Sequence, residues 1–182
     1  MREEIKNLVK EISEINDITL KNEIVVLGST YMKNFPFYEL VNKCRLEHAV
    51  YNRSMEGLTL DEVGEVLQPV VLDIKPSKVF LCFGENETDI EKAQAKYKEI
   101  IHKIRKELPN VEIYVVQLPD KSLLKFNEKA EELCDNKEVI GIKLLDKGDS
   151  RVERYKQQFK QLSRYFRDKK ITLTDIYAVV NL

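Results

Sequence analysis

The feature that most constrains the fold of this chain is a regular alternation of short apolar segments with amphipathic helical segments. Five apolar segments are expected to be strands, at residues 24–27, 48–51, 79–83, 111–116 and 139–145. Strands that alternate with helices are typical of βαβ units, in which a parallel sheet is covered on both faces. The alternation therefore predicts an α/β fold, a three-layer αβα sandwich with a flavodoxin-like five-stranded parallel sheet of order 2-1-3-4-5.

The helices between these strands are indicated by apolar periodicity and by capping residues. Residues 89–108 form the clearest helix, because apolar side chains recur there at three- and four-residue spacing. Thr59 and Ser150 are each followed by a glutamate three residues later, which predicts a capping box and a helix start. The first of these helices is expected to run on to Ile74, and a further helix is expected over residues 122–134. The helix after Ser150 is expected to turn five apolar side chains inward: Val152, Tyr155, Phe159, Leu162 and Phe166.

The whole chain, residues 1–182, is expected to form a single domain, because its length suits one sizeable core. Residues 1–15 predict an amphipathic helical arm that precedes the first strand. Residues 172–182 form a short apolar tail. No linker, low-complexity segment or internal repeat divides the sequence.

Charge and cysteine content limit the partners of the protein. The chain has 30 basic and 31 acidic residues spread along its length, so no basic stripe indicates a nucleic-acid partner. No apolar segment suits a signal peptide or a membrane span, so we expect a cytoplasmic protein with no membrane partner. The three cysteines are Cys44, Cys82 and Cys134, and no two of them have the spacing of a CxxC pair. They are expected to be buried free thiols. With two histidines and no cysteine pair, neither a metal site nor a cofactor is predicted.

Small polar residues follow four of the five predicted strands. They are Gly28-Ser29-Thr30, residues 52–57, Gly84-Glu85-Asn86 and residues 146–149. The carboxyl ends of parallel strands meet at one edge of the sheet, and ligands of open α/β sheets bind there. These four loops are therefore expected to lie together and to form the functional site.

The order and spacing of these loops resemble the SGNH (GDSL-type) hydrolase family, which comprises esterases and acylhydrolases of about this size and fold. In that family the first loop reads Gly-Asp-Ser and supplies the nucleophilic serine. The second reads roughly Asn-Arg-Gly-x-x-Gly and the third Gly-x-Asn-Asp, and these two supply a backbone and a side-chain oxyanion donor. The last reads Asp-x-x-His and holds the base and its orienting carboxylate. The resemblance covers about residues 22 to 166.

The resemblance implies catalytic positions for Thr30, Asp146 and Asp149. Thr30 stands where the family has its nucleophilic serine, and Ser29 stands where it has aspartate. Asp146 matches the family's aspartate, whereas Asp149 occupies the position of the histidine. The catalytic site is therefore expected to be degenerate.

The resemblance also implies an oxyanion and ligand-binding set: Ser29, Ser54, Gly57 and Asn86. Asn86 matches the family's side-chain donor, and Gly57 matches the second glycine of the second loop. Ser54 replaces the first glycine of that loop but retains a backbone N–H group. Each residue also has a structural interpretation, because glycines form tight turns and hydroxyls and carboxylates cap helices.

Three functional hypotheses follow. A hydroxyl needs a base within hydrogen-bonding distance, and a carboxylate with a pKa near ~4 is a poor base at neutral pH. The first hypothesis is therefore a catalytically impaired homologue that acts as a binding or regulatory domain for a small acyl-ester or sugar ligand. The second is an active hydrolase of such esters, with Thr30 as nucleophile and Asp146 raising the pKa of Asp149. The third is an oligomerising interaction protein that assembles through residues 1–15 and 172–182.

Overall fold

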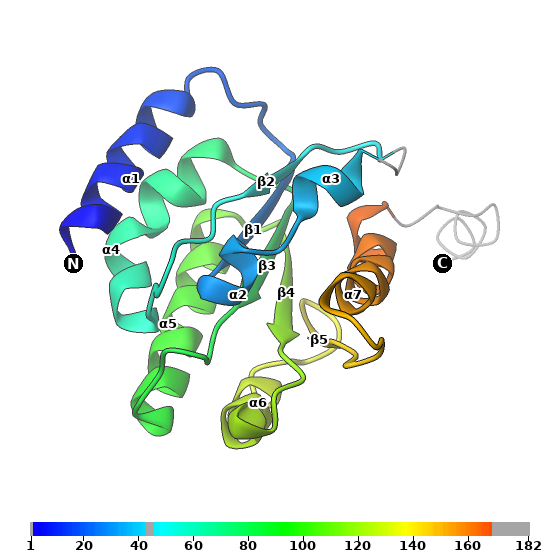
Figure 1. Ribbon diagram of the computed structural model, residues 1–182. Coiled ribbons are helices and arrows are strands. Elements are labelled where there is room, and N and C mark those ends of the chain that lie inside the picture. The colour runs from blue at the N-terminus through cyan, green and yellow to red at the C-terminus, as the bar shows by residue number, and fades with distance from the viewer. Residues whose placement is uncertain (1, 43–45, 169–182) are drawn as a thin grey trace, which may run out of the picture.

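A five-stranded, all-parallel sheet forms the middle layer of the molecule (Figure 1). The computed structural model describes residues 2–42 and 46–168. The order of the strands is β2-β1-β3-β4-β5, which confirms the predicted order 2-1-3-4-5. The strands are β1 (Ile24–Gly28), β2 (Val50–Asn52), β3 (Lys78–Cys82), β4 (Glu112–Gln117) and β5 (Val139–Lys143).

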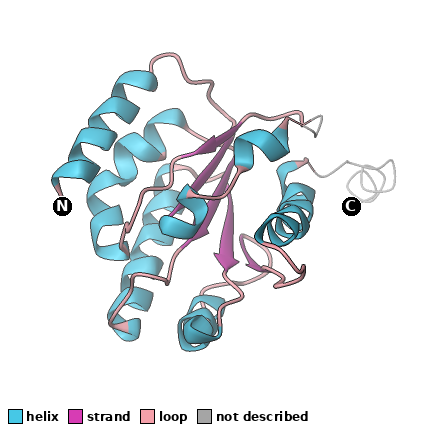
Figure 2. Ribbon diagram, viewed as in Figure 1, coloured by secondary structure: helices cyan, strands magenta, loops and turns pink. Residues whose placement is uncertain are grey.

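Helices cover both faces of this sheet, as the secondary-structure colouring makes clear (Figure 2). One face carries α1 (Glu3–Ile15), α4 (Leu60–Val70), α5 (Ile90–Glu107) and α6 (Leu124–Glu131). The other carries α2 (Thr30–Lys33), α3 (Phe37–Val41) and α7 (Arg151–Phe166). Short 3₁₀ helices, η1 (Leu72–Ile74) and η2 (Lys121–Leu123), complete the described elements. The predicted α/β sandwich of three layers is confirmed.

The alternation of side chains along each strand divides the core into two parts. On β1, Val25 and Leu27 pack beneath α4 and α5, whereas Ile24 and Val26 pack beneath α3 and α7. This follows from the two-residue period of a strand, whose successive side chains point to opposite faces. Because both faces are covered, β1 and β3 are buried along their whole length.

Several predicted boundaries differ from the structure. The second strand begins at Val50, so His48 precedes it. Helix α4 ends at Val70, one residue after Pro69, and a separate 3₁₀ turn carries Ile74. The predicted helix over residues 122–134 is a 3₁₀ turn followed by the shorter α6. Val152 is 60% exposed rather than inward, because the buried side chains of α7 begin only at Gln158.

The two predicted capping boxes have different outcomes. At α4, Thr59 and Glu62 form the complete reciprocal box. At α7, the Ser150 hydroxyl accepts a hydrogen bond from the Glu153 N–H at 3.2 Å. The Glu153 carboxylate, however, accepts from the N–H of Asp149 at 2.9 Å, one residue earlier than a capping box requires.

A buried lysine at the start of β3 fixes the end of α7. Lys78 is 2% exposed, and its Nζ donates to the carbonyl oxygens of Tyr165 at 3.3 Å and Arg167 at 2.8 Å. It also forms an ion pair with Asp168 at 3.1 Å, and Asp168 contacts His48 Nε2 at 2.9 Å. This cluster joins the end of α7 to the amino ends of β3 and β2.

Other sequence-based predictions concern the cysteines, the tail and membranes. Cys82 is a buried free thiol and Cys134 a half-buried one, whereas Cys44 lies outside the described residues. The tail, residues 172–182, also lies outside them. Across residues 2–42 and 46–168, the helices are too short or too polar to cross a lipid bilayer.

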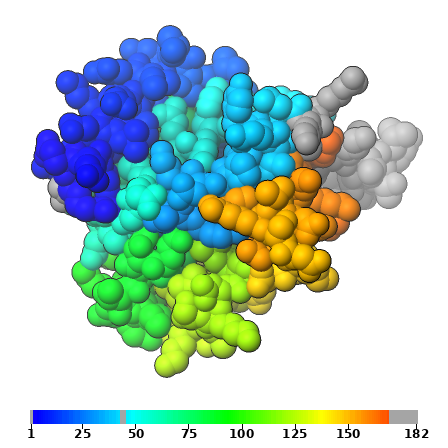
Figure 3. Space-filling view, in the orientation of Figure 1, coloured from blue at the N-terminus to red at the C-terminus, as the bar shows by residue number. Residues whose placement is uncertain are grey.

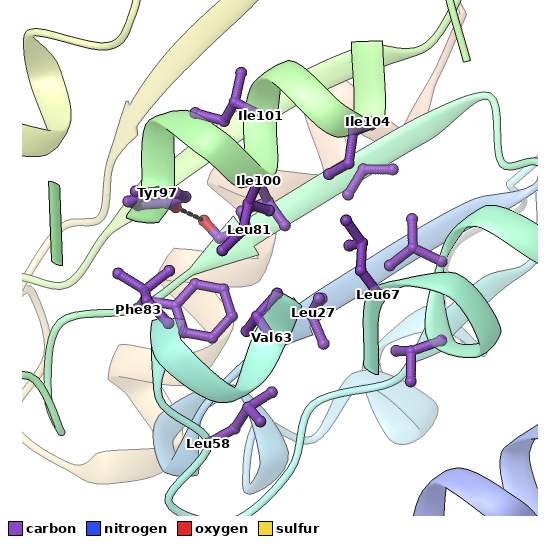
Figure 4. Close-up of a cluster of buried hydrophobic side chains, with 14 of the residues drawn as sticks. Leu27, Leu58, Val63, Leu67, Leu81, Phe83, Tyr97, Ile100, Ile101 and Ile104 are labelled. Atoms are coloured by element: carbon purple, nitrogen blue, oxygen red, sulfur yellow. Dashed lines mark hydrogen bonds between the residues drawn. The ribbon is translucent and has the colours of Figure 1, made fainter. Parts of the chain in front are cut away.

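The larger part of the core contains one buried hydroxyl, that of Tyr97 (Figure 4). It donates a hydrogen bond to the carbonyl oxygen of Leu81 at 3.0 Å and is enclosed by Phe83 and Ile100. Tyr97→Phe removes this bond but keeps the ring, so we expect it to lower the free energy of unfolding by about 1 kcal/mol. Urea unfolding measures this change. The control is Tyr38→Phe on the exposed side of α3, which is expected to change it by less than ~0.5 kcal/mol; equal effects would contradict the prediction.

Candidate functional site

The loops that follow β1, β2 and β3 meet at the carboxyl edge of the sheet, because the three strands are parallel neighbours. Strand β1 ends at Gly28, where a Cβ atom would lie only 2.6 Å from the carbonyl oxygen of Cys82. The next N–H group, that of Ser29, donates to the same oxygen at 3.3 Å. This close approach requires a glycine and turns the chain directly into α2 at Thr30.

Thr30 lies at the start of α2 and lines a cavity of about 310 Å³. Its hydroxyl oxygen accepts a hydrogen bond from the N–H of Gly57 at 3.0 Å. Gly57 has φ +63°, a backbone conformation that glycine adopts without strain. The other residues that line the cavity are Tyr31, Asn34, Glu85, Arg151, Arg154 and Tyr155.

The predicted side-chain oxyanion donor, Asn86, bonds to a neighbouring loop. Its Nδ2 donates to the hydroxyl oxygen of Ser29. Ser29 is 1% exposed, so this pair lies beneath the surface of the carboxyl edge. The bond joins the loop after β3 to the loop after β1, and it uses one of the two N–H groups of the amide that the resemblance assigns to the oxyanion.

The predicted backbone donor, the N–H group of Ser54, also bonds to another protein group. Its N–H donates to Asn52 Oδ1 at 3.2 Å, and Asn52 Nδ2 donates to the carbonyl oxygen of Met32 at 2.8 Å. The Ser54 hydroxyl is buried and has no hydrogen-bond partner within the described part of the chain. The structure thus brings Ser29, Thr30, Ser54, Gly57 and Asn86 to one edge, where they bond to other protein groups.

Glu85 is a residue of this edge that the sequence analysis did not select. Its Oε1 accepts a hydrogen bond from the backbone N–H of Tyr31 at 2.7 Å, and it lines the same cavity as Thr30. Burial raises the pKa of the Glu85 carboxyl, the bond from Tyr31 opposes this rise, and the nearby Glu56 adds to it. The sequence does contain a signal, since Glu85 stands between Gly84 and Asn86 in the third loop.

The two predicted catalytic aspartates lie farther along the edge. Asp146 lines an adjoining cavity of about 590 Å³, which shares Tyr31, Glu85 and Arg154 with the first. Arg154 Nε lies 3.8 Å from an Asp146 carboxylate oxygen. Asp149 is exposed and lines neither cavity. The structure therefore brings Thr30 together with Glu85, places Asp146 next to them and leaves Asp149 outside.

Both histidines of the chain lie at the opposite edge of the sheet. His48 precedes β2 and contacts Asp168 and Glu23. His102 lies on α5 and lines a separate cavity beside Pro109 and Asn110, before the start of β4. Neither imidazole is near Thr30. Within residues 2–42 and 46–168, no group of three or more side chains is arranged to hold a metal ion.

The first half of α7 forms one wall of the site. The ring of Tyr155 packs edge-on against Tyr31 at 5.9 Å and against Phe35 at 5.0 Å, measured between ring centroids. The Tyr31 hydroxyl donates to Gln158 Oε1 at 2.6 Å, and burial raises the pKa of Tyr31 to about 12. The space-filling view shows the start of α7, in orange, against the lighter blue surface of α2 and α3 (Figure 3). These contacts hold Arg151 and Arg154 beside the two cavities.

A parallel αβα sandwich with Gly-Ser-Thr, Asn-Arg-Ser and Gly-Glu-Asn loops at one carboxyl edge has the architecture of the SGNH hydrolases. Solved structures share this fold. A Streptococcus pneumonia protein assigned as a platelet activating factor matches with a TM-score of 0.77 and 18% identity, over 88% of this chain and 92% of that one. A GDSL-like lipase from Bacteroides thetaiotaomicron matches with a TM-score of 0.69 and 8% identity, over 87% and 96%.

A third match is an acetyl-xylooligosaccharide esterase from Geobacillus Stearmophilus, with a TM-score of 0.61 and 9% identity, over 84% of this chain and 98% of that one. No family model and no curated protein matches the sequence. At these identities the likeness establishes the fold, and it confirms the predicted SGNH hydrolase-like architecture.

The raised pKa of Glu85 predicts a specific dependence of stability on pH. Burial favours the protonated carboxyl in the folded state, so the folded-state pKa exceeds the unfolded value. The contribution of Glu85 to stability is therefore greatest below the unfolded pKa and declines as the pH rises through the folded pKa. Glu85→Gln removes this decline, so the free energy of unfolding of the variant minus that of the wild type is expected to increase between about pH 4 and pH 7.

Urea unfolding at several pH values measures this difference. The matched control is Glu11→Gln on the exposed side of α1, for which the difference is expected to show no comparable rise. A Glu85→Gln difference that falls with pH would show that the folded protein stabilises the charged carboxylate, contrary to the prediction.

Proposed function

We propose that this chain is an SGNH/GDSL-type esterase or acylhydrolase homologue whose hydrolytic activity is impaired, and that it acts as a binding or regulatory domain. One observation carries the proposal. The hydroxyls and donors at the family's catalytic positions bond to other protein groups, with Gly57 N–H on Thr30 and Asn86 on Ser29.

Electrostatic catalysis of acyl transfer needs donors that are directed at the developing oxyanion. Loss of one such donor typically costs on the order of 10² to 10³ in kcat. In this chain the Asn86 amide and the Ser54 N–H each have a protein acceptor. The Ser54 N–H would have to leave its acceptor before it bonded to a substrate oxygen, and the Asn86 amide has one of its two N–H groups already in use, so stabilisation of the transition state is weakened.

The base is the second deficiency. An imidazole has a pKa suited to taking a hydroxyl proton at neutral pH, whereas a carboxylate needs its pKa raised to do so. Both histidines lie at the opposite edge of the sheet, and Asp149 lines neither cavity. Thr30 therefore lacks the partner that activates the serine of the family.

The cavities suit a small polar ligand such as an acyl ester or an acylated sugar. The smaller cavity combines the Tyr155 ring with the guanidinium groups of Arg151 and Arg154, and the larger extends from it past Lys121. Sites of this size typically pair aromatic surface with a few directed polar groups. The structural likeness to an acetyl-xylooligosaccharide esterase supports a ligand of this class.

A second candidate function is hydrolysis by Thr30 with a carboxylate as the base. The observation that favours it is Glu85, which lines the same cavity and whose pKa is raised by burial. Asp146, in the adjoining cavity, would then belong to the same acidic group, in place of the predicted Asp146 and Asp149 pair.

The assay that separates these functions is hydrolysis of p-nitrophenyl acetate by the wild type and by Thr30→Ala. Loss of triad members costs on the order of 10⁴ to 10⁶ in kcat. We therefore expect both proteins to match the rate of buffer alone. Turnover by the wild type that Thr30→Ala abolishes would contradict impairment and support the second function, and Glu85→Gln would then test the base.

Ligand binding is tested separately, by calorimetric titration with an acetylated xylo-oligosaccharide. Arg154 borders both cavities, so Arg154→Leu is expected to raise the Kd roughly tenfold, the effect of losing one hydrogen bond to a charged group. Arg164→Leu, on the exposed side of the same helix, is the matched control and is expected to leave the Kd unchanged. Absence of binding by the wild type would remove support for this ligand class.

A further inference from the structure

A groove of about 570 Å³ lies at the outer edge of the sheet, beside β2 and between α1 and α3 (Figure 1). Residues 49–54, which include β2, line it together with these two helices. Among the described residues, it shares no lining residue with the two cavities of the candidate site. Small-molecule sites typically have volumes of roughly 300–1,000 Å³. The groove is therefore large enough to be a second, separate binding site.

Most of the side chains that line this groove are apolar. The helices contribute six of them: Leu8, Ile12 and Ile15 from α1, and Phe37, Tyr38 and Val41 from α3. Some of this surface is open to solvent, since Ile15 is 50% exposed and Tyr38 is 80% exposed. An apolar ligand that covered it would remove apolar surface from water on both sides of the contact, which favours binding.

The charged side chains of the lining are both cationic. Among the described residues that line the groove, Lys33 and Arg53 carry charge, and none is aspartate or glutamate. Lys33 is exposed at the end of α2, whereas Arg53 is only 7% exposed. A surface whose charges have one sign is complementary to a ligand of the opposite charge. The groove therefore suits a ligand that is anionic as well as apolar.

The buried guanidinium of Arg53 lies in the wall of the groove. Its Nη2 donates to Thr19 Oγ1 at 3.3 Å, and its Cζ lies 5.8 Å from the centroid of the Tyr51 ring. Thr19 and Tyr51 also line the groove. Within residues 2–42 and 46–168, no carboxylate pairs with this guanidinium; burial lowers the pKa of Arg53, and the Tyr51 hydroxyl opposes this change. Because a buried charge is costly unless it is paired, Arg53 favours an anion at this position.

A second buried polar group in the lining lacks a partner. Ser54 is 4% exposed, and its hydroxyl has no hydrogen-bond partner in the described part of the chain. The amide of Asn52, by contrast, is used at both ends, because Nδ2 donates to the Met32 carbonyl oxygen and Oδ1 accepts from Ser54 N–H. The buried polar groups that a ligand can still use are therefore the Arg53 guanidinium and the Ser54 hydroxyl.

We propose that this groove binds a fatty acid, whose carboxylate pairs with Arg53 and whose linear apolar chain lies between α1 and α3. A guanidinium has five N–H donors in a planar fork that fits a carboxylate. The bond to Thr19 uses one of them, so donors remain for a ligand. Binding at this edge of the sheet does not depend on the function of the two cavities at the candidate site.

Calorimetric titration of the full chain with decanoate at neutral pH tests the proposal. Decanoate is expected to bind one site. Each methylene that leaves water lowers the Kd about fourfold, so octanoate is expected to bind roughly 15-fold more weakly than decanoate. Absence of decanoate binding by the wild type would overturn the proposal.

Arg53→Met tests the contact with the carboxylate, because it removes the charge and keeps a long side chain. It is expected to raise the Kd of decanoate at least about tenfold, the effect of losing a hydrogen bond to a charged group. The Kd of decan-1-ol, which has the same chain without the charge, is expected to be unchanged. A decanoate Kd equal to that of the wild type would overturn the proposal.

A matched pair of surface variants tests the chain-binding part of the groove independently of Arg53. Ile15→Glu places a carboxylate in the groove at a half-exposed position and is expected to raise the Kd of decanoate at least about tenfold. Ile18→Glu makes the same change three residues later, at an 84% exposed position that does not line the groove, and is expected to leave the Kd unchanged. Equal Kd values for the two variants would overturn the proposal.

Two further measurements distinguish other sites and other occupants. Arg154→Leu, at the candidate site, is expected to leave the Kd of decanoate unchanged; a loss of affinity in Arg154→Leu but not in Arg53→Met would overturn the proposal. Sedimentation velocity without ligand is expected to give a monomer. A dimer that Ile15→Glu abolishes and Ile18→Glu retains would also overturn it, because a second copy of the chain would then occupy the groove.

Discussion

The close approach of β1 and β3 at Gly28 is the constraint on which the carboxyl edge depends. A Cβ atom at this position would lie 2.6 Å from the carbonyl oxygen of Cys82 and 3.0 Å from the Cβ of Met32. Because glycine leaves that space free, Ser29 turns under the end of β3, within hydrogen-bonding reach of Asn86. Thr30 then begins α2 beneath the loop that contains Gly57. The positions of Ser29 and Thr30 therefore depend on the absence of a side chain at Gly28.

The predicted site residues at the carboxyl edge bond to other protein groups, whereas Asp149 lines neither of the two cavities. Thr30, Asn86 and Ser54 lie at the same edge of the sheet, and each bonds to another protein group. The same bonds that hold the loops together also use the Ser54 N–H and one of the two N–H groups of the Asn86 amide. These bonds stabilise the loops but leave fewer hydrogen-bond donors for catalysis. This is the physical basis for proposing a binding function at Glu85 and the two arginines of α7.

The opposite edge of the sheet has a separate structural role. Buried Lys78 holds the carbonyl groups at the end of α7, and Asp168 extends this cluster to His48. A buried ammonium is stable there because its donors are paired with two carbonyl oxygens and a carboxylate. The cluster also determines where the chain leaves α7.

The sequence by itself determined the fold, because the periods of apolar residues fixed the strands, their order of connection and the edge where the loops meet. It also located Thr30, Ser54 and Asn86 at that edge. Its predictions that Val152 faces inward and that His48 begins a strand were wrong. Periodicity does not show where a helix leaves the sheet or where strand pairing begins. Only the tertiary structure decided which groups bond to each other, that Glu85 shares the cavity with Thr30, and that Asp149 does not. These outcomes depend on contacts between residues 27 to 127 positions apart, such as Gly57 with Thr30 and Tyr31 with Gln158, which local sequence patterns do not encode.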